Sequence, residues 1–238
     1  MRSGIRIILL CLFATFSSFA QQEWKDRVEY RIVDLQSEQL RMHWKDSNDS
    51  IIGSLSRLVE MYDSSAEELR YAVNGGIYEP GFVPTGLYIE KGDILNPLNL
   101  KDGNGNFYLK PNGVFAIYAD GSAAVMQSEA VTDVKDFQYA TQSGPMLLID
   151  GMHHPAFRKE SQSVKIRNGV GILPNGKVLL AKSRGLINFY TFAQFFKEMG
   201  CENALYLDGT ISRIYNPSSR QTPSLQPFAV MIAITPRN

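Results

Sequence analysis

The stretch that decides the fold runs from residue 191 to residue 209 and reads TFAQFFKEMGCENALYLDG. Its first part predicts an amphipathic helix, because Thr191 and Gln194 match a capping box and apolar residues recur at helical spacing until Gly200. Residues 204–207 then form a wholly apolar strand that ends at Asp208. This unit predicts a domain in which a helix and a buried strand belong to one core.

Working outward, short strands dominate the rest of the chain. Their apolar patterns predict strands at residues 28–35, 40–44, 70–73, 86–90, 114–118, 145–149, 169–173, 178–181 and 228–234. We expect the first two to pair as an opening hairpin, and a second amphipathic helix to begin at Ile51 with Ser50 as its cap. Two strong helices among many strands do not match regular β-α-β alternation. The predicted fold class is therefore α+β, a single domain with a mixed twisted β-sheet and a few flanking helices.

The N-terminus predicts export. Arg2 and Arg6 precede an apolar run at residues 7–16, and the small residues Ser18 and Ala20 frame a cleavage site. We therefore expect a signal peptide at residues 1–20, a mature domain at 21–238, and a periplasmic or secreted location. The apolar run is too short to cross a bilayer, so stable membrane insertion is not expected.

Charge and cysteine content exclude two further classes. The chain has 24 basic and 24 acidic residues; without Arg2 and Arg6 the basic count falls to 22, and the mature domain is slightly acidic. A general nucleic-acid binder is therefore not expected. Cys201 is the single cysteine after residue 20, so an internal disulfide is excluded and the core must supply the stability.

Small and polar residues gather where predicted strands start or end. These clusters are Asn74-Gly75-Gly76, Ser143-Gly144-Pro145 and Asp208-Gly209-Thr210-Ile211-Ser212. An acid at the end of a buried strand is either capped by the structure or held for chemistry. We expect the strands that end at Asn74 and Asp208 to meet at a shared cleft.

Six motifs follow one another in an order that resembles the phosphodiester glycosidase family. They are VNGGIY (73–78), GLYIE (86–90), KPNGVF (110–115), QSGPML (142–147), RNGVG (167–171) and LYLDG (205–209). The resemblance implies an exported hydrolase that cleaves between a sugar anomeric carbon and a phosphodiester, with a phosphorylated carbohydrate or envelope glycan as substrate. No cofactor is expected, and no residue is assigned as a metal ligand.

The resemblance also implies which residues form the site. Asp208 would activate water or stabilise the oxocarbenium ion, Arg167 would neutralise the phosphate, and Asn74 completes the catalytic set. The implied substrate-binding residues are Gly75, Gly76, Glu90, Ser143, Gly144, Lys182, Gly209, Thr210 and Ser212. A hydrogen bond from Thr210 or Ser212 would orient the Asp208 carboxylate.

Other interpretations stay open at this point. The chain could be a non-catalytic binder of phosphorylated carbohydrate, or a serine hydrolase built from Ser143, His154 and Asp208. Glu90 and Lys182 could be solvated surface residues rather than ligands of a substrate. His153 and His154 are adjacent in sequence, so a strand would point them to opposite faces, which argues against a shared metal.

Overall fold

The computed structural model describes residues 24, 26–209, 211–219 and 223–237. The predicted signal peptide and Thr210 lie outside the described residues. Within them the protein is α+β and mostly β, which confirms the predicted class. The strands divide among several sheets, and every pairing between described strands is antiparallel.

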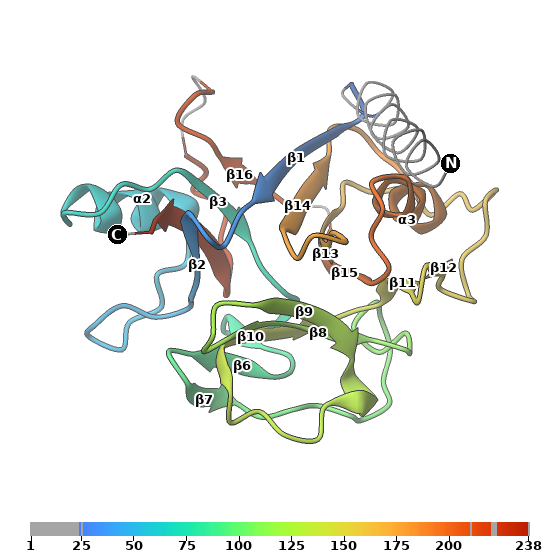
Figure 1. Ribbon diagram of the computed structural model, residues 1–238, viewed down its shortest axis with the longest axis horizontal. Coiled ribbons are helices and arrows are strands. Elements are labelled where there is room, and N and C mark those ends of the chain that lie inside the picture. The colour runs from blue at the N-terminus through green and yellow to red at the C-terminus, as the bar shows by residue number, and fades with distance from the viewer. Residues whose placement is uncertain (1–23, 25, 210, 220–222, 238) are drawn as a thin grey trace, which may run out of the picture.

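Three sheets carry the fold (Figure 1). The six-stranded sheet has the order β1 (Val28–Val33), β14 (Val178–Ser183), β13 (Asn168–Ile172), β15 (Ala204–Asp208), β11 (Met146–Ile149) and β12 (Met152–His153). The five-stranded sheet has the order β7 (Asp93–Asn96), β6 (Tyr88–Glu90), β10 (Phe137–Ser143), β8 (Gly113–Tyr118) and β9 (Ala123–Gln127). The four-stranded sheet has the order β16 (Ile214–Tyr215), β3 (Tyr71–Asn74), β17 (Met231–Pro236) and β2 (Glu38–His43). A small ribbon joins β4 (Tyr78–Glu79) to β5 (Val83–Pro84).

Both strong helices are present, with different caps from those expected. Helix α2 (Leu55–Asp63) is capped by Ser54, and helix α3 (Phe189–Glu198) is capped by Asn188, whose Oδ1 accepts a hydrogen bond from the Thr191 amide at 2.8 Å. The caps differ because several nearby polar side chains could serve, and tertiary contacts select one. A short 3₁₀ helix, η1 (Ser128–Ala130), completes the described helices.

The predicted opening hairpin is wrong. The turn itself forms, since the Ser37 amide donates to the Asp34 carbonyl at 3.0 Å. However, β1 pairs with β14 and β2 pairs with β17, so the two strands enter different sheets. An isolated two-stranded ribbon buries little apolar surface, whereas each strand gains a packed face by joining its own sheet.

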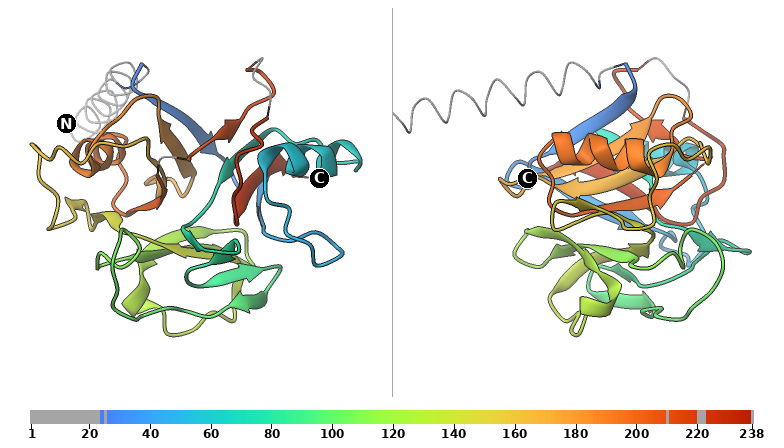
Figure 2. Two further views of the ribbon diagram at one scale, coloured as in Figure 1. Left: turned by 180° about the vertical axis from the view of Figure 1, so that it is seen from behind. Right: turned by 90° about the vertical axis from the view of Figure 1, so that its right-hand side faces the viewer.

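The core is divided between the layers. Helix α3 lies against one face of the six-stranded sheet, as Figure 2 shows from the side. Its phenylalanines belong to the apolar cluster between the helix and that face. The other face of that sheet packs against the four-stranded sheet, with Val170, Leu205 and Ile232 in one apolar cluster. Helix α2 covers the far face of the four-stranded sheet. No helix within the described residues is long and apolar enough to cross a membrane.

Candidate functional site

The site is built around a β-bulge at the end of β15. Gly169 lies opposite Tyr206 and Asn168 lies opposite Asp208, so Leu207 is an extra residue on β15. Without the extra residue, side chains would alternate regularly along β15, and Asp208 would point to the face covered by α3, as Tyr206 does. The bulge instead brings Asp208 to Asn74 of the four-stranded sheet, with Asn74 Nδ2 at 3.4 Å from Asp208 Oδ2. This contact confirms that the strands ending at Asn74 and Asp208 meet.

Two buried polar side chains form hydrogen bonds with the backbone groups that the bulge leaves without partners in the neighbouring strand. Ser143 Oγ donates to the Leu207 carbonyl at 2.7 Å, and the Asp208 amide donates to Asn168 Oδ1 at 2.6 Å. Asn168 Nδ2 then donates to the Asn74 carbonyl at 2.7 Å. Strand ends from all three sheets are thereby tied to one another at Asp208.

The Asp208 carboxyl is held in a poorly solvated position. Its Oδ1 accepts the Gly209 amide at 2.6 Å, and Asn74 approaches its Oδ2. Burial raises the pKa of Asp208 to about 6, and the two hydrogen bonds oppose that rise. Near neutral pH the group can therefore both accept and return a proton, which suits acid–base chemistry.

Asn74 and the neighbouring glycines are packed tightly. Asn74 Oδ1 accepts the Arg213 amide at 2.9 Å, so both ends of its side chain are engaged. A Cβ on Gly76 would lie 2.7 Å from Thr141 Oγ1, and one on Gly209 would lie 2.4 Å from the Tyr206 hydroxyl. Gly75 and Gly144 would meet Val230 and Asn112 in the same way. These glycines allow the strand ends to approach one another.

Lys182 lies in the same row as Asp208, that is, in the set of directly opposite residues that runs across the six-stranded sheet. Directly opposite residues put Glu29 beside Lys182, Lys182 beside Asn168, and Asn168 beside Asp208, across four neighbouring strands. Such cross-strand neighbours share one face of a sheet. Burial lowers the pKa of Lys182, Glu29 raises it, and the charges of Arg184 and Arg213 lower it. Arg184 and Arg213 therefore lie near Lys182.

Arg167 is placed on the opposite face of the six-stranded sheet. It precedes Asn168 by one position, and its guanidinium carbon lies 3.5 Å from the centre of the Phe189 ring. Its Nε donates to the Ile187 carbonyl at 2.9 Å and its Nη2 to the Ser163 carbonyl at 2.8 Å. Burial lowers the pKa of Arg167, and the Tyr206 hydroxyl raises it. Burial raises the pKa of Tyr206, the charge of Asp208 raises it further and the charge of Arg167 lowers it, so the phenol lies near both groups.

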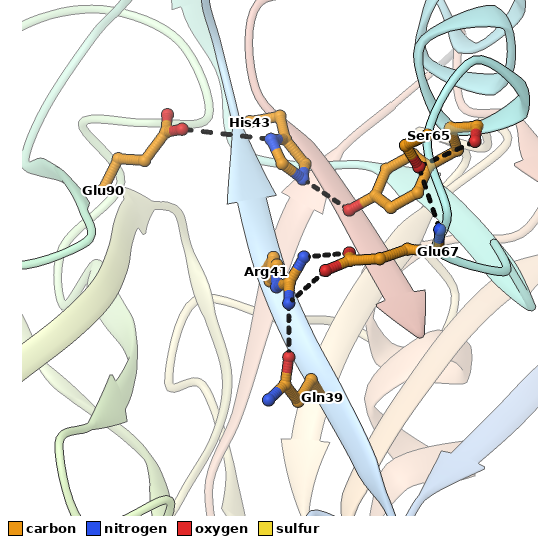
Figure 3. Close-up of polar contacts among 7 residues, drawn as sticks. Gln39, Arg41, His43, Ser65, Glu67 and Glu90 are labelled. Atoms are coloured by element: carbon orange, nitrogen blue, oxygen red, sulfur yellow. Dashed lines mark hydrogen bonds and ion pairs between the residues drawn. The ribbon is translucent and has the colours of Figure 1, made fainter. Parts of the chain in front are cut away.

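Glu90 has partners in a different part of the molecule. Its Oε2 accepts the Tyr88 hydroxyl at 2.7 Å, and His43 Nδ1 lies 3.9 Å from its Oε1 (Figure 3). Burial raises the pKa of Glu90. The structure therefore does not bring Glu90 to Asp208, and it does not leave this side chain solvated either.

Ser143 and Ser212 are engaged with the backbone. Ser143 Oγ accepts the Ile77 amide at 3.3 Å besides donating to Leu207, and Ser212 Oγ donates to the Gly209 carbonyl at 2.6 Å. Ser212 therefore shapes the turn after Asp208 rather than contacting the carboxylate. His154 Nδ1 accepts the Ala156 amide at 3.1 Å, and its ring stacks on Phe157. Nothing in these contacts activates Ser143 as a nucleophile.

Sequence reasoning missed residues that the structure places here. Asn168 links two strand ends, and Arg213 contacts Asn74. Burial raises the pKa of the Tyr78 phenol, and the nearby charge of Asp208 raises it further. Asn168 was detectable, because a polar residue opens the apolar strand 169–173. Within the described part of the chain, no group of three or more His, Cys, Asp or Glu residues could hold a metal ion.

A family model and a related protein both match the part of the chain that forms this site. The family model described as phosphodiester glycosidase matches residues 67–234, which include Asn74, Asn168, Lys182 and Asp208. The uncharacterized protein YigE of Escherichia coli is 38% identical over 235 residues, covering 98% of this chain and 92% of that protein.

Solved structures share the fold at low identity. The catalytic domain of zebrafish N-acetylglucosamine-1-phosphodiester alpha-N-acetylglucosaminidase, auto-inhibited by its pro-peptide, aligns with a TM-score of 0.58 at 16% identity, over 88% of this chain and 83% of that one. A hypothetical protein from Synechocystis aligns with a TM-score of 0.60 at 13% identity, over 88% and 59%. A putative exported protein from Burkholderia pseudomallei aligns with a TM-score of 0.57 at 11% identity, over 87% and 73%.

Proposed function

The chain belongs to the phosphodiester glycosidase family, and from that premise we propose that it is an exported hydrolase of sugar phosphodiesters. Water attacks at the anomeric carbon, the bond from that carbon to the phosphodiester oxygen breaks, and a free sugar and a phosphomonoester leave. The substrate is a phosphorylated carbohydrate or an envelope glycan. Export rests on the signal peptide predicted for residues 1–20.

One observation carries the proposal: a carboxyl group with a raised pKa and a lysine stand in one row of the six-stranded sheet. Asp208 and Lys182 are each opposite Asn168, on either side of it. Neighbouring strands lie about 4.8 Å apart, so the two backbones are about 10 Å apart and the long lysine side chain can span much of that distance. An anionic glycoside needs this combination, a carboxylate at the sugar and a cation at the phosphate.

Asp208 has the properties of the group that acts on the sugar. As a carboxylate it takes a proton from the attacking water or stabilises positive charge at the anomeric carbon. A phosphate monoester is a good leaving group without protonation, so a second carboxylic acid is less necessary than in ordinary glycosidases. Asn74 holds the Asp208 carboxyl from the neighbouring sheet and limits its rotation.

Lys182 and Arg213 are the groups that we assign to the phosphate. Arg213 donates its amide to Asn74, and its side chain is close enough to Lys182 to lower the pKa of that amine. Arg167, with its guanidinium stacked on Phe189, contributes to the phosphate subsite through its charge and without a direct contact. The catalytic roles of Asp208, Arg167 and Asn74 stay predictions.

The proposal is tested with a panel of sugar-1-phosphodiesters and the matching methyl glycosides. We expect reducing sugar and phosphomonoester to appear in equal amounts from phosphodiesters, with no release from glycosides that lack phosphate. Equilibrium binding is measured on the same panel. Saturable binding without release from any member identifies the protein as a non-catalytic binder, and a covalent intermediate trapped on Ser143 identifies a serine hydrolase; either result contradicts the proposal.

Lys182→Gln is expected to lower kcat/KM for an active phosphodiester by about tenfold or more, because a charge-assisted contact to the phosphate is lost. The loss should appear mainly in KM if the contact is already made with the bound substrate. The matched control is Lys135→Gln, at an exposed lysine in the turn before β10, which should leave kcat/KM unchanged. Equal kinetics for Lys182→Gln and the wild type would remove Lys182 from the phosphate subsite.

A further inference from the structure

A polar cavity lies away from Asp208, between the four-stranded and five-stranded sheets. Its volume is about 300 Å³, which is at the lower end of the range for small-molecule sites. Neither Asn74, Asn168 nor Asp208 lines it. Its polar lining comes from β2, from the ends of β8 and β10, and from the residue after β17: Glu38, Gln39, Arg41, Tyr118, Gln138, Tyr139 and Arg237.

The guanidinium of Arg41 is held in a fixed position at the wall of this cavity. Both Nη atoms donate to the Glu67 carboxylate, and Nη2 also donates to Gln39 Oε1 at 2.6 Å. Glu67 is itself placed by Ser65, whose Oγ accepts the Glu67 amide at 3.1 Å and donates to the Tyr62 carbonyl at 2.8 Å. Figure 3 shows these contacts along one face of β2. A donor group held this firmly loses little conformational entropy when a ligand binds.

The next side chain on that face of β2 adds no charge at neutral pH. His43 Nε2 lies 2.9 Å from the Tyr62 hydroxyl, and burial lowers the pKa of His43 to about 4. The Arg41 and Glu67 charges balance each other. Glu38, the acid in the lining, is paired with Arg31, whose Nη2 donates to Glu38 Oε1. The remaining positive charge of the cavity lining therefore comes from Arg237.

Arg237 belongs to the same sheet as Arg41, because it follows β17, which pairs with β2. Its Nη1 donates to the Leu35 carbonyl, and the guanidinium passes over Gly121, where an added Cβ would lie 3.3 Å from Nη1. Gly121 has a φ of 84°, so a side chain there would be strained as well as close to Arg237. None of the ion pairs between described residues involves Arg237.

One phenol, that of Tyr139, and two amides supply the neutral contacts, because the ring of Tyr118 packs against Phe137 on the other face of the five-stranded sheet. Tyr139 is half-buried, and burial raises the pKa of its phenol, so the hydroxyl keeps its proton at neutral pH. Gln39 and Gln138 each offer a donor and an acceptor. Sugar hydroxyls both donate and accept, and the flat face of a sugar packs on aromatic rings, so this lining matches a saccharide.

We propose that this cavity is a second saccharide-binding site, separate from the Asp208 site, for a sugar unit that carries an acidic group. Arg237 binds the carboxylate or phosphate of that sugar, Tyr139 contacts its ring, and Arg41 and the glutamines bind its hydroxyls. The site adds affinity for acidic glycans and takes no part in bond cleavage. It does not depend on the reaction assigned to Asp208.

Calorimetric titrations of the protein with glucuronic acid, glucose 6-phosphate and glucose test this site. We expect saturable binding of at least one acidic sugar, with glucose weaker, and at least about a tenfold loss of that affinity in Arg237→Gln. Glucuronic acid against glucose 6-phosphate shows whether the acid group is a carboxylate or a phosphate. Gln138→Ala, at an exposed side chain, should weaken binding several-fold without changing the melting temperature.

Two controls separate this site from the Asp208 site. Arg158→Gln removes an exposed arginine that bonds to carbonyls of its own turn, and should not change the affinity. Asp208→Asn should also leave the affinity unchanged. The proposal is overturned if no acidic sugar binds, if Arg237→Gln binds as the wild type does, or if Asp208→Asn abolishes binding, since the last result would place the sugar at Asp208.

Discussion

Asp208→Asn is expected to lower the turnover of a sugar phosphodiester by about a hundredfold or more without unfolding the protein. The amide keeps the shape of the side chain and one acceptor for the Gly209 amide, but it cannot take a proton from water. The measurement is kcat on the most active phosphodiester of the panel, with circular dichroism to confirm the fold. Asp136→Asn, at an exposed turn before β10, is the matched control and should retain full activity.

The pH profile separates a catalytic role for Asp208 from a structural one. Because burial raises the pKa of this carboxyl to about 6, a base at Asp208 predicts that kcat/KM falls as the pH drops through about 6. The same shift affects stability: the folded state binds the proton more tightly than the unfolded state, whose pKa is near 3.8, so the contribution of Asp208 to stability decreases as the pH rises from about 4 to about 6. Asp208→Asn should remove both effects.

Two results would contradict this account of Asp208. Wild-type turnover in Asp208→Asn would show that the reaction does not need the carboxylate. A variant that is inactive because it unfolds, and that is less stable than the wild type at neutral pH, would show that Asp208 is a structural residue.

Asn168→Ala is expected to lower the free energy of unfolding by about 2–4 kcal/mol, and turnover with it. Asn168 is fully buried, and its side chain satisfies the Asp208 amide and the Asn74 carbonyl. Alanine leaves both backbone groups without partners and releases the bulge that aims Asp208. Urea denaturation measures the stability, and kcat on the same phosphodiester measures the effect on the site.

Asn175→Ala is the matched control for Asn168→Ala. Asn175 lies in an exposed turn, where its Oδ1 accepts only the Lys177 amide at 3.2 Å. We expect a change in unfolding free energy within about 0.5 kcal/mol and unchanged turnover. If the two alanine variants are equally stable and equally active, Asn168 does not hold the site together.

Local patterns predicted the elements that rely on their own apolar residues. The helix near residues 191–199 and the strands at 204–207 and 228–234 appear as α3, β15 and β17 because one apolar face or run must be buried in any compact fold. The opening hairpin failed because pairing is not a local property. β1 pairs with β14, which lies about 150 residues further along the chain, and this pairing buries apolar residues on both faces of the six-stranded sheet.

The sequence by itself determined the fold class, the family, and the presence of an acid at the end of a buried strand beside a glycine. It placed Asn74 and Asp208 at strand ends that were expected to meet, and the hydrogen bond between them agrees. Tertiary structure alone decided which side chains share the site. One extra residue, Leu207, reverses the side to which Asp208 points, and strand register brings Lys182 into its row while alternation turns Arg167 away. A bulge and a register depend on partner strands distant in sequence, and a shift of one residue exchanges the two faces of a sheet, so no local pattern contains that information.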